Sequence, residues 1–358
     1  MTRDDSQLFA NLETSGPRPL SALQKLGWQN IFSAQLSPED MTRTPPVRVC
    51  EVHRSGLTVR GDGTIAHLPP SLDATVGDWL LYNIENPVQS VVLKPKSLFK
   101  RRAPGHGREV QKIAANVDTV FVVSSCNADF NVARLERYVA LAFKAEVAPV
   151  IVLTKPDLCE DSMGYAQQAQ AISNRVPVLV LNARDGDAQT ALSEWCKPGQ
   201  TVAFLGSSGV GKSTLVNALM GADATETAAI REDDAKGRHT TTSRQLYFTP
   251  EGVAILDTPG MRELQLTDVR SGIETLFADM LELSHQCKFR DCSHETEPGC
   301  AVRAAVENGD LDPARLDRWR KLETEDRLNS ATLAERRARD KPFGKVVRNA
   351  TKHKKKGR

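Results

Sequence analysis

A glycine-rich segment constrains the fold of this 358-residue chain more than any other feature. The segment is Gly206-Ser207-Ser208-Gly209-Val210-Gly211-Lys212-Ser213. An apolar run over 201–205 precedes it and predicts a buried strand, and apolar residues at helical spacing follow from Thr214. Strand, loop and helix in this order form a phosphate-binding loop, because the glycines let backbone N–H groups point inward and the helix N-terminus adds positive potential. We therefore predict that the segment binds nucleotide phosphates.

Individual roles follow from this loop. We expect Lys212 to contact the β- and γ-phosphates as a catalytic residue, and Ser213 to offer its hydroxyl to Mg²⁺. A second apolar run, 253–256, predicts another buried strand that ends at Asp257, followed by Thr258-Pro259-Gly260. Asp257 is expected beside the magnesium ion, with the Gly260 N–H near the γ-phosphate.

A threonine-rich segment, Gly237-Arg238-His239-Thr240-Thr241-Thr242, lies between the loop and this second strand. A threonine here would bind Mg²⁺ only while the γ-phosphate is present, which makes the segment a first switch and the segment from Asp257 to Gly260 a second. Thr240 and Thr241 are both candidates.

The base is read by a different part of the chain. A short apolar strand over 149–153 leads to Thr154-Lys155-Pro156-Asp157. The carboxylate of Asp157 can accept two hydrogen bonds from guanine N1 and N2, which adenine cannot supply, so the pattern favours GTP over ATP and disfavours a P-loop kinase. Thr154 stands where the broader GTPase pattern prefers Asn. A third strand, 176–181, precedes Asn182-Ala183-Arg184, where a backbone N–H meets guanine O6 unless this is a plain loop.

The order of these motifs is unusual. The guanine motif precedes the phosphate loop, whereas an ordinary GTPase chain contains them in the opposite order. The parts of a nucleotide site need to be neighbours in space only, so the sequence predicts a circularly permuted GTPase domain.

Four potential metal ligands lie within one short stretch: Cys287, Cys292, His294 and Cys300. The other cysteines, Cys50, Cys126, Cys159 and Cys196, are scattered singly. Three thiolates and an imidazole suit one closed, tetrahedral structural zinc site, and Pro298-Gly299 provides a turn. Free buried thiols are the alternative, and His285 is an alternative ligand to His294.

Together these motifs resemble the RsgA (YjeQ) family of circularly permuted GTPases that act in small ribosomal subunit assembly. The resemblance covers most of residues 45–325 and includes Ile113-Ala114-Ala115-Asn116-Val117-Asp118, Asp129-Phe130-Asn131 and Leu135-Glu136-Arg137-Tyr138. It favours His294 as the fourth zinc ligand. It also implies that the chain binds the small (30S) subunit and its 16S rRNA, and that it hydrolyses GTP to GDP and phosphate with stimulation by the subunit. The alternative is a nucleotide-gated RNA-binding module whose own hydrolysis is negligible.

The alternating segments 47–52, 57–60, 64–68, 79–84 and 90–93 predict five short strands, with Gly61-Asp62-Gly63 as a hairpin turn. Pattern alone does not separate an OB barrel from an SH3-like barrel, and the resemblance favours the OB fold. We expect an N-terminal extension at 1–44, an OB barrel at 45–103, the permuted GTPase domain at 104–268, a helical zinc domain at 269–340 and a basic tail at 341–358. Asp312-Pro313 should begin a long charged helix that runs to about residue 337.

Charge is unevenly distributed. The net charge is +2, but residues 341–358 carry eight Lys or Arg and no acid, which leaves −6 for residues 1–340. Such a tail suits a phosphate-rich surface, although an idle solvated tail is the alternative. A second basic stretch, Lys94, Lys96, Lys100, Arg101 and Arg102, stands between two expected domains. Metal-like cysteine spacing predicts a cytoplasmic protein, and the lack of a signal peptide or membrane-length apolar run predicts no membrane contact. We also expect a monomer, although these patterns do not determine the oligomeric state.

Slow intrinsic hydrolysis is expected. Many GTPases place a water-orienting glutamine directly after the DxxG motif, and this chain has Met261 there. His239 is the nearby side chain best suited to position water, while Arg238 and Arg262 are candidates to stabilise charge. The alternative is that all three face solvent or rRNA.

Overall fold

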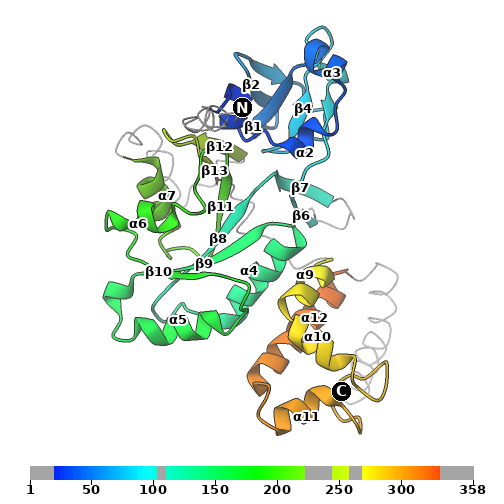
Figure 1. The fold of residues 1–358 in the computed structure, drawn as a ribbon, viewed down its shortest axis with the longest axis vertical. Coiled ribbons are helices and arrows are strands. Elements are labelled where there is room, and N and C mark those ends of the chain that lie inside the picture. Colours follow the sequence, from blue (N-terminus) through cyan, green and yellow to red (C-terminus); the bar gives the residue numbers. More distant parts are fainter. Residues whose placement is uncertain (1–19, 103–109, 222–243, 258–267, 331–358) are drawn as a thin grey trace, which may run out of the picture.

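The computed structural model describes residues 20–102, 110–221, 244–257 and 268–330. Three units follow one another along the long axis of the molecule: a small β unit with the N-terminal helices, a central sheet flanked by helices, and a helical unit (Figure 1). Among the described residues, no helix combines the length and apolar character needed to cross a membrane.

The central unit is a doubly wound sheet in the order β10-β9-β8-β11-β13-β12. All neighbours are parallel except β12, which runs antiparallel to β13. The strands are β8 (Thr119–Ser125), β9 (Ala148–Thr154), β10 (Val178–Val180), β11 (Thr201–Leu205), β12 (Arg244–Phe248) and β13 (Ala254–Asp257). The predicted strands at 149–153, 176–181, 201–205 and 253–256 are therefore confirmed, with small differences at their ends.

Helices cover both faces of this sheet, as the continuous apolar runs of its strands require. The helices are α4 (Val132–Lys144), α5 (Ser162–Gln170), α6 (Asp187–Leu192) and α7 (Lys212–Met220). Buried residues of α4 and α5 pack in one apolar cluster, and those of α6 and α7 pack in another on the opposite side.

The winding direction reverses between β8 and β11. The chain proceeds from β8 outward through β9 to β10, then returns to place β11 on the other side of β8. In doubly wound sheets, ligands bind beyond the carboxyl ends of the strands at such a reversal. The phosphate loop follows β11 at that point, and the guanine motif follows β9 on the same edge.

The N-terminal β unit contains β1 (Pro46–His53), β2 (Gly56–Gly61), β3 (Ile65–Leu68), β4 (Trp79–Leu81) and β5 (Val91–Val92), with the short helix η2 (Pro87–Gln89) before β5. Strand β1 pairs with both β2 and β4, and β4 pairs with β5. The Gly61 N–H donates to Thr64 O at 2.8 Å, so the expected hairpin turn is confirmed. The five predicted strands are present, and the OB assignment stays a prediction.

Three short helices from the segment before β1 cover this unit: α1 (Ala22–Lys25), α2 (Asn30–Ser33) and α3 (Pro38–Arg43). Fully buried Phe32 packs beside Trp79, with ring centroids 6.0 Å apart. The described part of the N-terminal extension is thus folded onto the β unit.

A buried arginine connects the β unit to the central sheet. Arg48 of β1 is 1% exposed, and its guanidinium donates to Thr201 Oγ1 at 2.8 Å and to Leu26 O at 2.6 Å. Strand β1 also pairs with β12, so one sheet continues through both units. A two-stranded sheet, β6 (Leu98–Arg102) and β7 (Val110–Ala115), lies between them in the chain.

The helical unit comprises α9 (Arg270–Leu276), α10 (Ala278–Ser284), α11 (Ala301–Glu307) and α12 (Pro313–Ser330). Asp312 Oδ1 accepts the Ala314 N–H at 2.9 Å, which confirms the predicted start of the last helix. Its predicted end near residue 337 lies outside the described residues.

Candidate nucleotide site and metal centre

The phosphate loop has the strand–loop–helix geometry that its sequence predicts. It runs from the end of β11 to the start of α7, whose N-terminus at Lys212 faces the loop. Gly206 and Gly211 both have positive φ, +149° and +98°. A Cβ at Gly206 would lie 2.3 Å from Val123 O, so only glycine lets the loop turn this close to β8.

The side chain of Lys212 folds back over the loop. Its Nζ donates to Gly206 O at 2.9 Å and also contacts Ser207 O. These contacts hold the ammonium group beside the loop. The β- and γ-phosphates of a bound nucleotide are expected at this position. Ser213 is exposed and is the second residue of α7, directly after Lys212 in the chain.

A pocket of about 480 Å³ joins the guanine motif to the phosphate loop. The lining residues are Thr154, Lys155, Asp157, Leu158, Asn182, Ala183, Arg184, Ser208, Gly209, Gly211, Lys212, Ser213 and Thr214. The structure therefore gathers most of the expected nucleotide-binding residues around one cavity. It adds Leu158, which is 70% exposed and which the motif pattern did not single out.

The guanine motif is tied directly to the phosphate loop. The buried Thr154 hydroxyl donates to Val210 O at 2.6 Å, and Lys155 Nζ donates to Gly209 O at 2.7 Å. Lys155 has a left-handed backbone, φ 58°, which turns the chain from β9 into the short helix η3 (Pro156–Leu158) that carries Asp157. Thr154 therefore supplies a hydrogen bond to the loop at the position where Asn is more usual.

The remaining base-side residues form a tight turn. Asn182 Oδ1 accepts the backbone N–H of Arg184 at 3.1 Å, so the loop after β10 closes on itself beside the pocket. Pro156, Gly206, Ser207 and Val210 belong to the same motifs but do not line this pocket.

The switch residues are only partly described. Asp257 is the last residue of β13, which is parallel to β11, so its backbone lies at the same sheet edge as the loop. Arg238, His239, Thr240, Thr241, Gly260, Met261 and Arg262 lie outside the described residues.

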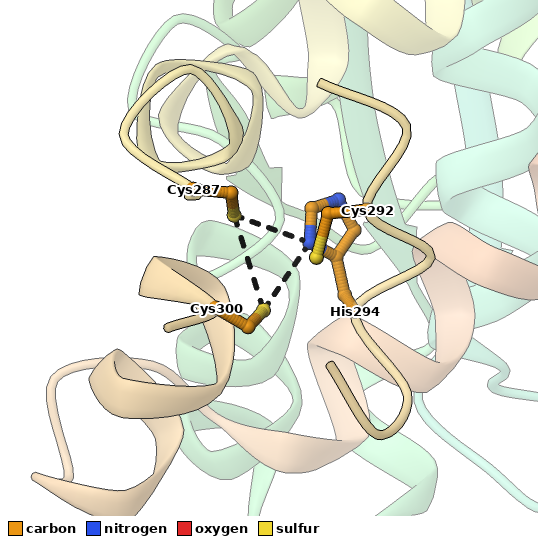
Figure 2. Close-up of side chains that lie close together, drawn as sticks. All are labelled: Cys287, Cys292, His294 and Cys300. Atoms are coloured by element: carbon orange, nitrogen blue, oxygen red, sulfur yellow. Dashed lines mark hydrogen bonds between the residues drawn. The ribbon is translucent and has the colours of Figure 1, made fainter. Parts of the chain in front are cut away.

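The four expected zinc ligands converge. Their ligand atoms all lie within 4.8 Å of one another, and the cluster contains His294 and not His285. Cys287 follows α10, and Cys300 is the N-cap of α11. Figure 2 shows the side chains of Cys287, Cys300 and His294 pointing toward a common centre, with Cys292 beside the imidazole.

The spacing of these atoms fits a zinc ion. Cys287 Sγ lies 3.9 Å from Cys300 Sγ and 3.6 Å from His294 Nδ1, and His294 Nδ1 lies 3.4 Å from Cys300 Sγ. Ligands on a tetrahedral zinc ion with its usual bond lengths are roughly 3.8 Å apart for two sulfurs and roughly 3.6 Å for sulfur and nitrogen. Three sulfurs and one nitrogen are also the donor set of closed structural sites.

Two neighbours fix the histidine of this cluster. Its ring packs against Trp319 of α12, with centroids 5.4 Å apart, and its backbone carbonyl accepts a hydrogen bond from Arg320. Burial of the imidazole lowers the pKa of His294, which favours the neutral ring that a metal requires. The cluster is thus attached to the longest helix of this unit.

Comparisons with known proteins agree with this geometry. The model of the RsgA GTPase family matches residues 92–267. The chain is 47% identical over 350 residues to small ribosomal subunit biogenesis GTPase RsgA 2 of Vibrio parahaemolyticus, covering 96% of each chain. It is 49% identical over 335 residues to the RsgA protein of Mesorhizobium japonicum, covering 91% of this chain and 96% of that one.

Two solved structures are similar in fold. YjeQ from Thermotoga maritima has a TM-score of 0.56 and 26% identity, covering 77% of this chain and 96% of that chain. YloQ, described as a circularly permuted GTPase, also has a TM-score of 0.56, with 24% identity over 81% of this chain and 97% of its own, and is evidence for the fold alone. Motif order, sheet topology and relatedness over nearly the full length agree that this chain is a circularly permuted GTPase belonging to the RsgA family.

Proposed function

We propose that this protein binds the small ribosomal subunit late in its maturation and hydrolyses GTP there, with the subunit accelerating the reaction. The observation that carries the proposal is identity of 47% and 49% over almost the whole chain to proteins named as small ribosomal subunit biogenesis GTPases. The cytoplasm is the compartment we infer, and a monomer is the form we expect to act.

We assign guanine recognition to Asp157, supported by Lys155 and by the backbone of Asn182 and Ala183. The pocket that contains these residues reaches the phosphate loop, so one nucleotide can occupy both ends. The loop amides and Lys212 would hold the phosphates and neutralise the charge that develops as water attacks the γ-phosphorus. No covalent intermediate with the protein is required.

A magnesium ion bound with GTP would stabilise charge on the β- and γ-phosphate oxygens. Ser213 and Asp257 are the ligands we infer from their places at the start of α7 and the end of β13. Thr240 or Thr241 would be the third magnesium ligand. The Gly260 N–H would donate to the γ-phosphate. We assign His239 to positioning the attacking water, since Met261 offers no useful hydrogen bond.

The helical unit offers a route for the subunit to act on the second switch. Eight residues after Gly260, the Asp268 N–H donates to Ser330 Oγ at 2.8 Å, and the Val269 N–H donates to Asp326 Oδ1 at 3.0 Å. Both acceptors belong to α12, which also packs on the zinc-ligand cluster through Trp319. A partner that binds the zinc-bearing unit would therefore act on the chain that follows the switch.

We infer that 16S rRNA is part of the binding surface. Lys94, Lys100 and Lys144, together with Glu146 and Asp268, line a groove of about 710 Å³ between the β6–β7 segment and α4. The tail at 341–358 carries eight more cations. Clustered cations gain from releasing counterions on a nucleic acid. Deleting residues 341–358 should lower the affinity of the protein for the small subunit and make that affinity less dependent on salt concentration. If the salt dependence of binding does not change, the tail does not contribute to rRNA binding.

Single-turnover GTP hydrolysis with and without purified small subunits tests the proposal. Wild-type protein should hydrolyse GTP slowly alone and faster with the subunit. His239→Ala should lose most of the stimulation while binding GTP, and His285→Ala, which alters an exposed histidine outside the metal cluster, should retain it. No stimulation of the wild type would contradict the proposed function, and full stimulation of His239→Ala would remove only that residue from the mechanism.

A further inference from the structure

Arg134 lies beside the phosphate loop although it is 73 residues away in sequence. It is in the first turn of α4, where its backbone N–H donates to the N-cap side chain of Asn131 at 2.9 Å. Helix α4 begins just beyond the carboxyl end of β8, and β8 is the neighbour of β11. The topology therefore brings this turn of helix to the loop.

The guanidinium of Arg134 donates to the side-chain oxygen of Ser207 at 2.5 Å. Ser207 is the second residue of the loop, and its backbone carbonyl is a partner of Lys212 Nζ. Two cations, one from α4 and one from α7, thus converge on a single residue of the loop. Converging cations repel each other, and a bound polyanion removes that repulsion.

Among the described residues, no carboxylate forms an ion pair with Arg134. The neighbouring residues of α4 differ in this respect, since Glu136 pairs with Arg318 and Arg137 with Glu325. Arg134 is exposed, so a hydrogen bond to a neutral hydroxyl barely offsets the entropy of ordering its side chain. A phosphate oxygen would be a stronger acceptor, because a charge-assisted bond is roughly twice as strong as a neutral one.

We propose that Arg134 is an arginine supplied in cis, whose guanidinium moves from the Ser207 hydroxyl to an oxygen of the transferred phosphate and stabilises the charge that develops there during hydrolysis. The inference rests on the proposed hydrolysis of GTP at this site. In the reaction, a water oxygen bonds to the γ-phosphorus while the bond from that phosphorus to the β–γ bridging oxygen breaks and GDP leaves. The proton that the water loses passes to the phosphate product or to solvent. Arg134 transfers no proton and changes only the energy of the charged oxygens.

The same helix explains how a partner would influence this arginine. Helix α4 contacts the phosphate loop through Arg134 and the helical unit through Glu136 and Arg137. A shift of α12 against α4 would therefore move the guanidinium relative to the loop. Subunit stimulation would then depend on Arg134 as well as on the switches.

The test compares Arg134→Ala, Arg134→Lys and the matched control Arg175→Ala, which removes an exposed arginine of the same domain away from the pocket. Single-turnover hydrolysis with small subunits should fall roughly 1,000-fold in Arg134→Ala, the lower end of what such arginines contribute. Arg134→Lys should recover only part of the rate, because a lysine lacks the planar fork. The control should match the wild type.

Ligand affinities distinguish stabilisation of the transferred phosphate from a purely structural role, in which Arg134 only holds the phosphate loop in place through Ser207. GDP lacks the transferred phosphate, so its Kd should change less than about threefold in Arg134→Ala. GDP with aluminium fluoride, which imitates the transferring phosphate, should lose most of its affinity. Unchanged hydrolysis in Arg134→Ala, or a loss of GDP affinity as large as the loss of rate, would overturn the inference. A wild type that does not hydrolyse GTP would instead contradict the proposed function.

Discussion

Glu136 of α4 and Arg318 of α12 form an ion pair that joins the GTPase domain to the helical unit. Both carboxylate oxygens accept from Arg318 Nε at 2.9 Å, and the Glu136 side chain is fully buried. Burial raises the pKa of Glu136, while the hydrogen bond and charge of Arg318 oppose that change. The carboxylate of this pair is therefore out of contact with water, in an interface where apolar residues of α4 also pack with those of α9 and α12.

Removing one partner of this pair should be strongly destabilising. Arg318→Met removes both hydrogen bonds of the buried carboxylate and leaves it only Arg315, whose Nη1 is 4.0 Å away. Breaking a buried pair in this way costs about 3–5 kcal/mol. Denaturant unfolding measures the change. Glu307→Gln is the control, because the exposed Arg303–Glu307 pair on α11 contributes under about 1 kcal/mol. Equal stability of both variants would show that the pair does not hold the units together.

Asp157→Asn should weaken GTP binding and shift preference toward xanthosine nucleotides, because the amide no longer accepts both guanine N–H groups. Titration calorimetry with GTP, XTP and ATP measures the effect. Asp161→Asn is the matched control, since Asp161 caps α5 through Gly164 N–H and asparagine caps equally well. Unchanged GTP affinity in Asp157→Asn would remove this residue from the base site.

Removal of zinc, or Cys292→Ser, should unfold the segment around residues 280–305 and leave the central sheet folded. Structural zinc contributes on the order of 10 kcal/mol to such sites. Metal analysis and amide hydrogen exchange report the two effects. Cys196→Ser, outside the cluster, should keep one zinc per chain. Protein purified without chelators that contains no zinc would count against the site.

The stability of the β unit should depend on pH through Asp78. Burial raises the pKa of this carboxyl from 3.8 to about 6, although its oxygen accepts the Thr75 N–H at 2.8 Å. A folded-state pKa above the unfolded value means that this stability is fully present below about pH 4 and lost as the pH rises through about 6, up to about 3 kcal/mol in all.

Asp78→Asn removes this titration and keeps the amide oxygen as an acceptor. Relative to the wild type, the variant should therefore gain about 1 kcal/mol between pH 5 and pH 7.5. Unfolding followed by tryptophan emission suits the measurement, because Trp79 is the next residue and is fully buried. A constant difference between the two proteins across this range would show that Asp78 does not titrate there.

Local motifs were predictable from the sequence because their geometry is set by neighbouring residues. The phosphate loop is a strand, a turn and a helix in direct succession, and the glycines dictate its path. The metal ligands lie within a single short segment, so only a short loop has to close to bring them together. The same holds for the hairpin at Gly61 and the cap at Asp312.

The segment before β1 could not be interpreted in this way. Its helices α1 and α2 have four residues each, which is too short for apolar periodicity to appear. They are held in place by burial against the β unit, as Phe32 beside Trp79 shows. Short helices gain their stability from packing, which a sequence pattern does not display.

By itself the sequence determined which chemical groups the protein has: a phosphate loop, a guanine-reading carboxylate and a thiolate-rich metal cluster. Only the tertiary structure decided which distant groups meet. Strand β8 separates the two halves of the nucleotide site, and its position brings Arg134 to Ser207 and, through α4, Glu136 to Arg318. The physical reason is that such pairings close long loops, so they are selected by the packing of the whole sheet and its helices and by no local preference.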